Sequence, residues 1–193
     1  MSDIRIVAGE FRGRRIAVPE TGTRPLADRM RQSLFAVLEP RLLGARVIDL
    51  CAGSGAAGIE ALSRGAAHAT LVERAPRAAA VIRSNIAQLG LDERATVVSA
   101  DALRTLETLG ARGELFDLII LDPPYDDAVL RAALLERLAG PDSVVAPRGL
   151  VVATGRRGGG ADGQEGAGAL RLVRELVFGE SVIELRERRV EES

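Results

Sequence analysis

The chain has 193 residues, of which 47% are hydrophobic and 27% are charged, with a formal net charge of −1 and no tryptophan. These values are typical of one soluble globular domain, or one domain with a small appendage, and they exclude a wholly disordered or collagen-like protein. The apolar runs are too short to span a membrane, and the single cysteine, Cys51, cannot form an internal disulfide. The first residues lack the apolar stretch of a signal peptide, so we expect a cytoplasmic protein.

The first part of the chain predicts a basic hairpin and helix. Residues 4–18 alternate loosely between apolar and polar around a glycine-containing turn, which favours a β-hairpin. A helix is expected from Pro25 to Pro40, with apolar residues at helical spacing between them. We therefore divide the chain into an N-terminal arm, residues 1–40, and a catalytic domain, residues 41–193.

The rest of the chain alternates short apolar runs with helical stretches, a pattern that predicts an α/β fold with a doubly wound parallel sheet. Ligands of such a sheet bind beyond the carboxyl ends of its strands. The expected strands are residues 46–50, 69–72, 96–99, 117–121 and 150–153, and the expected helices end near 64, cover 76–89, follow 101 and cover about 127–138.

The C-terminal part predicts a loop followed by a hairpin. Residues 155–168 hold seven glycines in fourteen positions, which is typical of a flexible loop. Residues 170–178 and 181–186 then form a closing β-hairpin around Gly179-Glu180.

A glycine turn follows the first strand of the sheet. Gly53, Gly55 and Gly58 satisfy the spacing G-x-G-x-x-G, and Glu73 follows Gly53 by 20 residues at the end of the second strand. Such glycines let a ligand approach the backbone and the N-terminus of the next helix. This pattern alone is compatible with a nicotinamide dinucleotide whose ribose binds Glu73.

Two acidic residues favour a different ligand. Asp49 places a carboxylate at the turn, where it repels a pyrophosphate and attracts an ammonium group, and Asp101-Ala102 follow the third strand, where an adenine amino group could bind. A ligand with an amino acid, a ribose and an adenine matches this set, so we predict S-adenosylmethionine. The candidate cofactor-binding residues are Asp49, Ala52, Gly53, Ser54, Gly55, Gly58, Glu73, Arg74, Asp101, Ala102 and Asp122.

A second motif, Asp122-Pro123-Pro124-Tyr125, follows the fourth strand. The Asp122 carboxylate and the Pro123 carbonyl could accept hydrogen bonds from the two N–H groups of a planar amino group. These hydrogen bonds would direct the nitrogen lone pair toward a methyl donor. Tyr125 could stack on a nucleobase. We therefore predict Asp122, Pro123 and Tyr125 as catalytic residues, with no metal required.

With these motifs the chain resembles the bacterial RsmD-type methyltransferases. The resemblance covers most of the chain, and its most specific parts are residues 23–25 with Asp28-Arg29, residues 49–58, 60–66 and 122–125. It implies a class I methyltransferase fold with seven strands, the last antiparallel, and methylation of the N2 amino group of a guanine in 16S ribosomal RNA. It also implies that this RNA is met in an assembling small ribosomal subunit.

The resemblance gives the basic arm a role in RNA docking, through Arg12, Arg14, Arg24, Arg29 and Arg31. The chain departs from the family pattern at Gln32, at Ala153-Thr154, where a glutamate is common, and in the glycine-rich loop. We expect a monomer.

Three alternatives stay open at this point. The same motif serves DNA adenine-N6 and protein-glutamine methyltransferases, which also present a planar amino nitrogen. The glycine spacing leaves a nicotinamide-dependent oxidoreductase, and the basic arm leaves a non-catalytic RNA-binding module.

Overall fold

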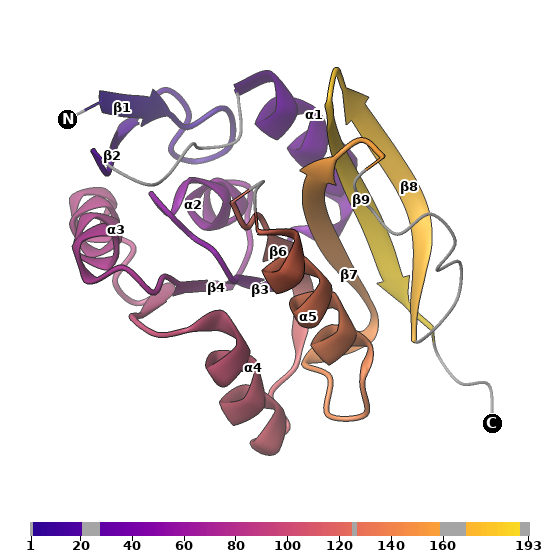
Figure 1. Ribbon diagram of the computed structural model, residues 1–193. Coiled ribbons are helices and arrows are strands. Elements are labelled where there is room, and N and C mark those ends of the chain that lie inside the picture. Colours follow the sequence, from indigo (N-terminus) through magenta and orange to yellow (C-terminus); the bar gives the residue numbers. More distant parts are fainter. Residues whose placement is uncertain (1, 21–27, 125–126, 159–168, 190–193) are drawn as a thin grey trace.

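The computed structural model describes residues 2–20, 28–124, 127–158 and 169–189 (Figure 1). The chain starts with the predicted hairpin, formed by β1 (Ser2–Arg5) and β2 (Arg15–Val18). These strands pair antiparallel, with Ser2 opposite Val18. Helix α1 (Asp28–Leu38) follows and passes into a short 3-10 turn, η1 (Glu39–Arg41).

The remaining strands form a seven-stranded sheet in the order β5-β4-β3-β6-β7-β9-β8. Strand β9 lies antiparallel between β7 and β8, whereas β3 to β7 are mutually parallel. This is the class I Rossmann-like methyltransferase fold that we expected, with the N-terminal hairpin added. Its elements are β3 (Arg46–Asp49), α2 (Ala56–Ser63), β4 (His68–Val72), α3 (Pro76–Leu89), β5 (Ala95–Val98), α4 (Ala102–Ala111), β6 (Phe116–Leu121), α5 (Ala128–Ala139), β7 (Val145–Arg156), β8 (Leu170–Phe178) and β9 (Ser181–Arg188).

Helices cover both faces of the sheet (Figure 1). Successive residues of a strand point to opposite faces, so Val47 packs with Leu34 of α1 on one face, and Ile48 packs in the core that includes Leu134 of α5 on the other. Ile6 and Ile16 of the hairpin belong to the first of these cores. The N-terminal arm therefore shares its hydrophobic core with the sheet.

Strand β7 is longer than the sequence predicted. It runs from Val145 to Arg156, so the first two residues of the expected glycine-rich loop belong to the strand. Its pairing with β6 shifts register between Phe116 and Leu118, and Arg148 has a positive φ of 61°. The apolar pattern therefore begins only after this irregularity, and the sequence did not indicate the earlier start of the strand. The part of the loop from 159 to 168 lies outside the described residues.

The order of the strands places a topological switch between β3 and β6. From β3 the chain builds outward through β4 and β5, then returns to β6 on the other side of β3. The helices that follow β3 and β6 therefore leave to opposite faces, and the carboxyl ends of these two strands are where a ligand of such a sheet is expected to bind. Within the described ranges, no helix is long and apolar enough to cross a membrane.

Candidate active site

The turn between β3 and α2 is formed by glycines in conformations that other residues rarely adopt. Gly53 and Gly55 have φ values of 55° and 80°, and Gly55 is the residue from which α2 starts. The Gly58 backbone lies so close to β4 that a Cβ atom there would stand 2.5 Å from Leu71 Cδ2. Ala52 N–H donates to the oxygen of Val72 over 2.9 Å, which ties the turn to the neighbouring strand.

Glu73, after β4, holds this turn from the other side. Its Oε2 accepts a hydrogen bond from Gly53 N at 2.9 Å, and its Oε1 accepts one from Ala75 N at 2.8 Å. Both oxygens thus contact the backbone, a structural role that the sequence did not indicate. A carboxylate oxygen has further lone pairs, so the predicted ribose contact stays compatible with this geometry.

Asp49, at the end of β3, is a buried carboxylate with one unpaired oxygen. It is 2% exposed, and its Oδ1 has no hydrogen-bond partner among the described residues. Burial, together with the nearby charge of Asp122, raises the pKa of Asp49 to about 7. A positively charged ligand group would relieve both the missing partner and the repulsion.

Asp122, at the end of β6, is the second carboxylate of this edge. Burial raises its pKa to about 6, against the lowering effect of a hydrogen bond that its Oδ1 accepts from the Thr154 hydroxyl. Pro123 is buried, and the oxygen of Pro124 accepts a hydrogen bond from Asp127 N at 2.9 Å. Tyr125 lies outside the described residues, so its stacking role stays a prediction.

The other predicted cofactor residues lie along the same edge. Asp101 caps α4 by accepting a hydrogen bond from Arg104 N at 3.2 Å, beside the buried Ala102. Ser54 is buried in the turn, and Arg74 is exposed after β4. The tips of β5, β4, β3 and β6 therefore present Asp101, Glu73, Asp49 and Asp122 in the order of the strands in the sheet.

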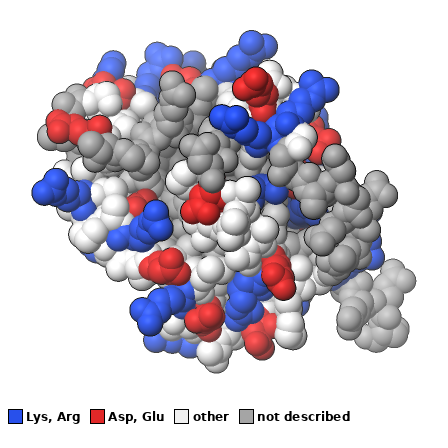
Figure 2. Space-filling model, viewed as in Figure 1, with Lys and Arg blue, Asp and Glu red and all other residues white. Residues whose placement is uncertain are grey.

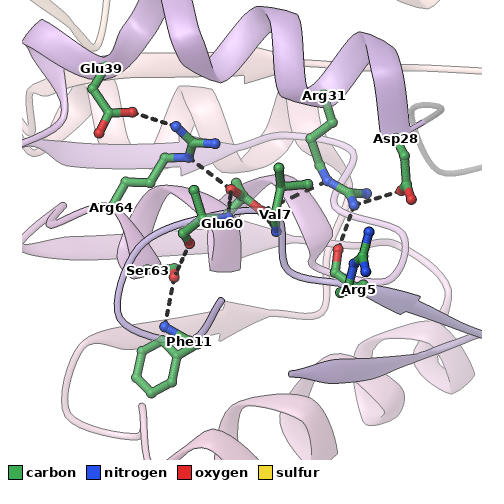
Figure 3. Close-up of polar contacts among 10 residues, drawn as sticks. Arg5, Val7, Phe11, Asp28, Arg31, Glu39, Glu60, Ser63 and Arg64 are labelled. Atoms are coloured by element: carbon green, nitrogen blue, oxygen red, sulfur yellow. Dashed lines mark hydrogen bonds and ion pairs between the residues drawn. The ribbon is translucent and has the colours of Figure 1, made fainter. Parts of the chain in front are cut away.

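A buried ionic cluster centred on Glu60 fastens the N-terminal arm to α2 (Figure 3). Glu60 is 1% exposed and accepts hydrogen bonds from Val7 N at 2.8 Å and Ala8 N at 3.0 Å. Arg64 donates to the same carboxylate over 2.8 Å, and Arg31 approaches it at 3.9 Å. Glu60 was not among the predicted site residues. Its one signal was an acidic residue inside the otherwise apolar helix at residues 58–62.

The prediction that Arg31 contacts RNA is wrong. Arg31 is 1% exposed, and its guanidinium donates to the oxygen of Arg5 at 2.7 Å and to Asp28 at 2.8 Å (Figure 3). A side chain enclosed in this way cannot reach a phosphate. Its charge is needed inside the protein because Glu60 is buried beside it.

Arg12 and Arg14 are exposed, as predicted, but they lie far from the glycine turn between β3 and α2. The hairpin tip that carries them packs against the end of α2, where Glu10 N donates to Ser63 O at 2.7 Å. Arg14 also donates to Gln88 O near the end of α3. Helices α2 and α3 both start at the carboxyl ends of the parallel strands and run away from them. The hairpin tip therefore lies toward the amino ends of these strands, at the opposite edge of the sheet. Arg29 is exposed in the first turn of α1, and Arg24 lies outside the described residues.

Asn85 joins the N-terminal arm to the glycine turn between β3 and α2. It is 1% exposed in the middle of α3, and its amide donates to Ser54 O at 3.1 Å and to Ala17 O at 2.9 Å. Its Oδ1 accepts from Ala17 N at 2.9 Å. Asn85 was not among the predicted site residues. The signal for this role was an amide between the buried Ile82 and Ile86, on the apolar face of the helix.

Over the ranges that the structure covers, no cluster of three or more histidine, cysteine or acidic side chains could hold a metal ion.

The chain is similar to known proteins both in sequence and in structure. The model of the family described as "Conserved hypothetical protein 95" matches residues 4–187. The "Putative rRNA methyltransferase YlbH" of Bacillus subtilis is 42% identical over 68% of this chain and 72% of its own length. The "Ribosomal RNA small subunit methyltransferase D" of Escherichia coli K12 is 39% identical over 68% of this chain, and the match spans 65% of that protein. The solved structure of "Putative methyltransferase yhhF" from Escherichia coli superposes with a TM-score of 0.84 at 33% identity, covering 98% of this chain and all of that one (100%).

Proposed function

Since the chain belongs to the family described as "Conserved hypothetical protein 95", the RsmD-type family, we propose that it is an S-adenosylmethionine-dependent methyltransferase acting on small-subunit ribosomal RNA. The acceptor is the exocyclic N2 amino group of a guanine in the 16S RNA. One observation carries this proposal: two carboxylates, the buried Asp49 and the half-buried Asp122, stand at the tips of the adjacent strands β3 and β6. One is suited to a cationic donor and the other to an amino acceptor.

The donor half of the site fits S-adenosylmethionine. The unpartnered oxygen of Asp49 would accept hydrogen bonds from its ammonium group, Glu73 its ribose hydroxyls and Asp101 its adenine amino group. When bound, this donor supplies a methyl group activated by a positively charged sulfur. The acidic edge also disfavours the pyrophosphate of a nicotinamide dinucleotide, which was the alternative that the glycine spacing left open.

The acceptor half performs alignment and proton transfer. The lone pair of a guanine N2 amino group is delocalised into the ring, so the nitrogen is a weak nucleophile. Asp122, held by Thr154, accepts a hydrogen bond from one N–H of the amino group, and the carbonyl oxygen of Pro123 accepts a hydrogen bond from the other. As the nitrogen gains the methyl group it loses a proton, and Asp122 is the base placed to receive it.

The class of acceptor can be tested with the purified protein and a donor that carries a labelled methyl group. We expect label in small-subunit ribosomal RNA, offered either as naked RNA or as unmethylated 30S particles. Genomic DNA and a protein extract serve as parallel acceptors. Label in DNA alone or in protein alone would replace the RNA acceptor by an adenine or a glutamine, whose amino groups suit the same Asp-Pro-Pro corner.

A further inference from the structure

The substrate half of the ligand edge is formed by the tips of β6 and β7. The predicted donor contacts lie at the tips of β3, β4 and β5, so an acceptor that meets the donor at Asp122 comes from the side of β7. Thr154 of β7 contacts Asp122 directly. Whatever projects from β7 beyond Thr154 therefore borders the place where the acceptor must lie.

Two exposed arginines follow at this point. Arg156 is the last residue of β7, two positions after Thr154 and on the same face of the strand, and Arg157 comes next. At about 3.3 Å per strand residue, both backbones lie within roughly 10 Å of Thr154. Neither arginine forms an ion pair with another described residue.

Near this strand end the arginines outnumber the acidic residues. Glu184 of β9 is neutralised by Arg131 at 2.8 Å and by Arg186 at 2.9 Å. Glu180, whose backbone oxygen accepts from Arg157 N at 2.7 Å, stands in the turn before β9. Figure 2 shows several basic side chains, with acidic ones among them, on the upper part of the molecule, over the region where Figure 1 places the end of β7.

Helix α1 brings a further arginine toward the same place. Arg41, the last residue of the η1 turn that follows α1, donates to the oxygen of Arg148 near the start of β7 at 2.9 Å. The C-terminal end of α1 thus lies by the start of β7, and its first turn, with the exposed Arg29, lies toward the end of that strand. The hairpin tip with Arg12 and Arg14 lies instead at the opposite edge of the sheet.

We infer that Arg156 and Arg157 form the phosphate-binding surface that docks substrate RNA at the active site, with Arg29 beside them. This inference rests on the proposed function, because it names the docking surface of the same site. Guanidinium groups pair well with phosphate oxygens, and such contacts position a nucleic acid without reading its sequence. Docking here holds the RNA backbone next to Asp122, where the guanine must be presented.

The test compares two double variants with the same charge change. Arg156→Gln with Arg157→Gln removes the proposed surface, and Arg12→Gln with Arg14→Gln removes two exposed arginines at the far edge. Binding to in vitro transcribed 16S RNA is measured over a salt series. Each lost phosphate contact reduces the slope of log affinity against log salt by about 0.7–0.9, so the first variant should lose about 1.4–1.8 and the second close to none.

Two further readouts separate docking from folding and from chemistry. The Arg156→Gln/Arg157→Gln variant should keep the donor affinity and the kcat of the wild type at saturating RNA, with a raised KM for RNA. Lysine at both positions should restore the slope. An unchanged slope in this variant, or an equal loss in the far-edge variant, would overturn the inference while methyl transfer to RNA by the wild type continues. Failure of the wild type to methylate any RNA would instead refute the proposed function.

Discussion

The hydroxyl of Thr154 at the tip of β7 donates a hydrogen bond to Oδ1 of Asp122 at the tip of β6. The backbone oxygen of Thr154 in turn accepts from Arg131 Nε at 2.9 Å, and Arg131 pairs with Glu184 of β9 at 2.8 Å. One oxygen of the proposed acceptor carboxylate is therefore fixed by the neighbouring strand. The Thr154 hydroxyl that holds Asp122 is a neutral donor.

Removing the Thr154 hydroxyl should move the pH dependence of methyl transfer. The pKa of Asp122 is about 6, and the bond from Thr154 lowers it, so Thr154→Val raises this pKa further. Only the ionised Asp122 carboxylate can accept a hydrogen bond from the amino group and then take up the proton that its nitrogen loses. The value of kcat therefore falls as pH drops through the pKa of Asp122. In the variant this fall should start at a higher pH, measured by single-turnover rates at saturating donor.

The matched control for this prediction is Thr154→Ser, which keeps the hydroxyl and should keep the wild-type acid limb. The buried carboxylates nearby are Asp49 and Glu73, and neither substitution changes them. An acid limb at the same pH in the valine and serine variants would show that Thr154 does not act through Asp122.

Asp49→Asn should weaken donor binding. The loss of a charged acceptor for an ammonium group corresponds to about 1.5–3 kcal/mol, or roughly a 10- to 150-fold rise in Kd, measured by calorimetry with S-adenosylmethionine. Glu107→Gln, an acid-to-amide change on the exposed part of α4, is the control and should leave Kd unchanged. A Kd equal to that of the wild type would remove Asp49 from the donor site.

The same substitution should change how stability depends on pH. In the folded protein the pKa of Asp49 is raised from 3.8 to about 7, so the folded state binds this proton more tightly than the unfolded chain. Its contribution to the free energy of unfolding is fully present below about pH 4 and is lost as pH rises through about 7. In urea unfolding of the donor-free protein, the wild type should lose stability relative to Asp49→Asn between these pH values. A pH-independent difference would contradict the raised pKa.

Asn85→Leu should loosen both the hairpin and the glycine turn. The change leaves Ala17 N, Ala17 O and Ser54 O without the amide that they contact, and unsatisfied buried groups cost about 1–3 kcal/mol each. We expect a loss of at least about 2 kcal/mol in denaturant unfolding, with weaker donor binding, because the turn backbone is no longer held. Ser84→Ala, at the exposed neighbouring position, should change neither quantity.

Two glycines of the arm with the same backbone conformation offer a matched pair. Gly9 and Gly13 have φ values of 83° and 85°, but a Cβ atom at Gly9 would stand 1.9 Å from Ser63 O, whereas at Gly13 nothing lies within 4 Å. Gly13→Ala should cost about 1–2 kcal/mol from the left-handed conformation alone. Gly9→Ala should cost clearly more, because the hairpin must leave α2. Equal unfolding free energies for the two variants would contradict the close packing of the arm.

The sequence was sufficient for the features that depend on local pattern. The helix at 76–89 was predicted with its observed ends, because Pro76 starts it and Gly90 ends it in a left-handed conformation. The glycine turn and the acidic strand tips were also found, because residue type, spacing and the ends of apolar runs are visible in one dimension. The β7 start was missed where the register shift at Phe116 interrupts the pattern.

The features that were missed depend on partners distant in the chain. Arg31 and Arg12 look alike in the sequence, and their burial differs because Glu60, 29 positions after Arg31, lies next to only one of them. Asn85 contacts Ala17 across 68 positions, so its bridging role required the fold. Net charge in a segment therefore indicated a basic arm but not which of its arginines face solvent.

The most direct test of the proposed activity is mass spectrometry of small-subunit ribosomal RNA from cells with and without this protein. We predict that one N2-methylguanosine disappears from the 16S RNA in its absence and returns with the wild-type gene but not with Asp122→Ala. An identical set of methylated nucleotides in both cells, or the loss of a methyl group on a ribose or ring nitrogen instead, would contradict an acceptor amino group held at Asp122.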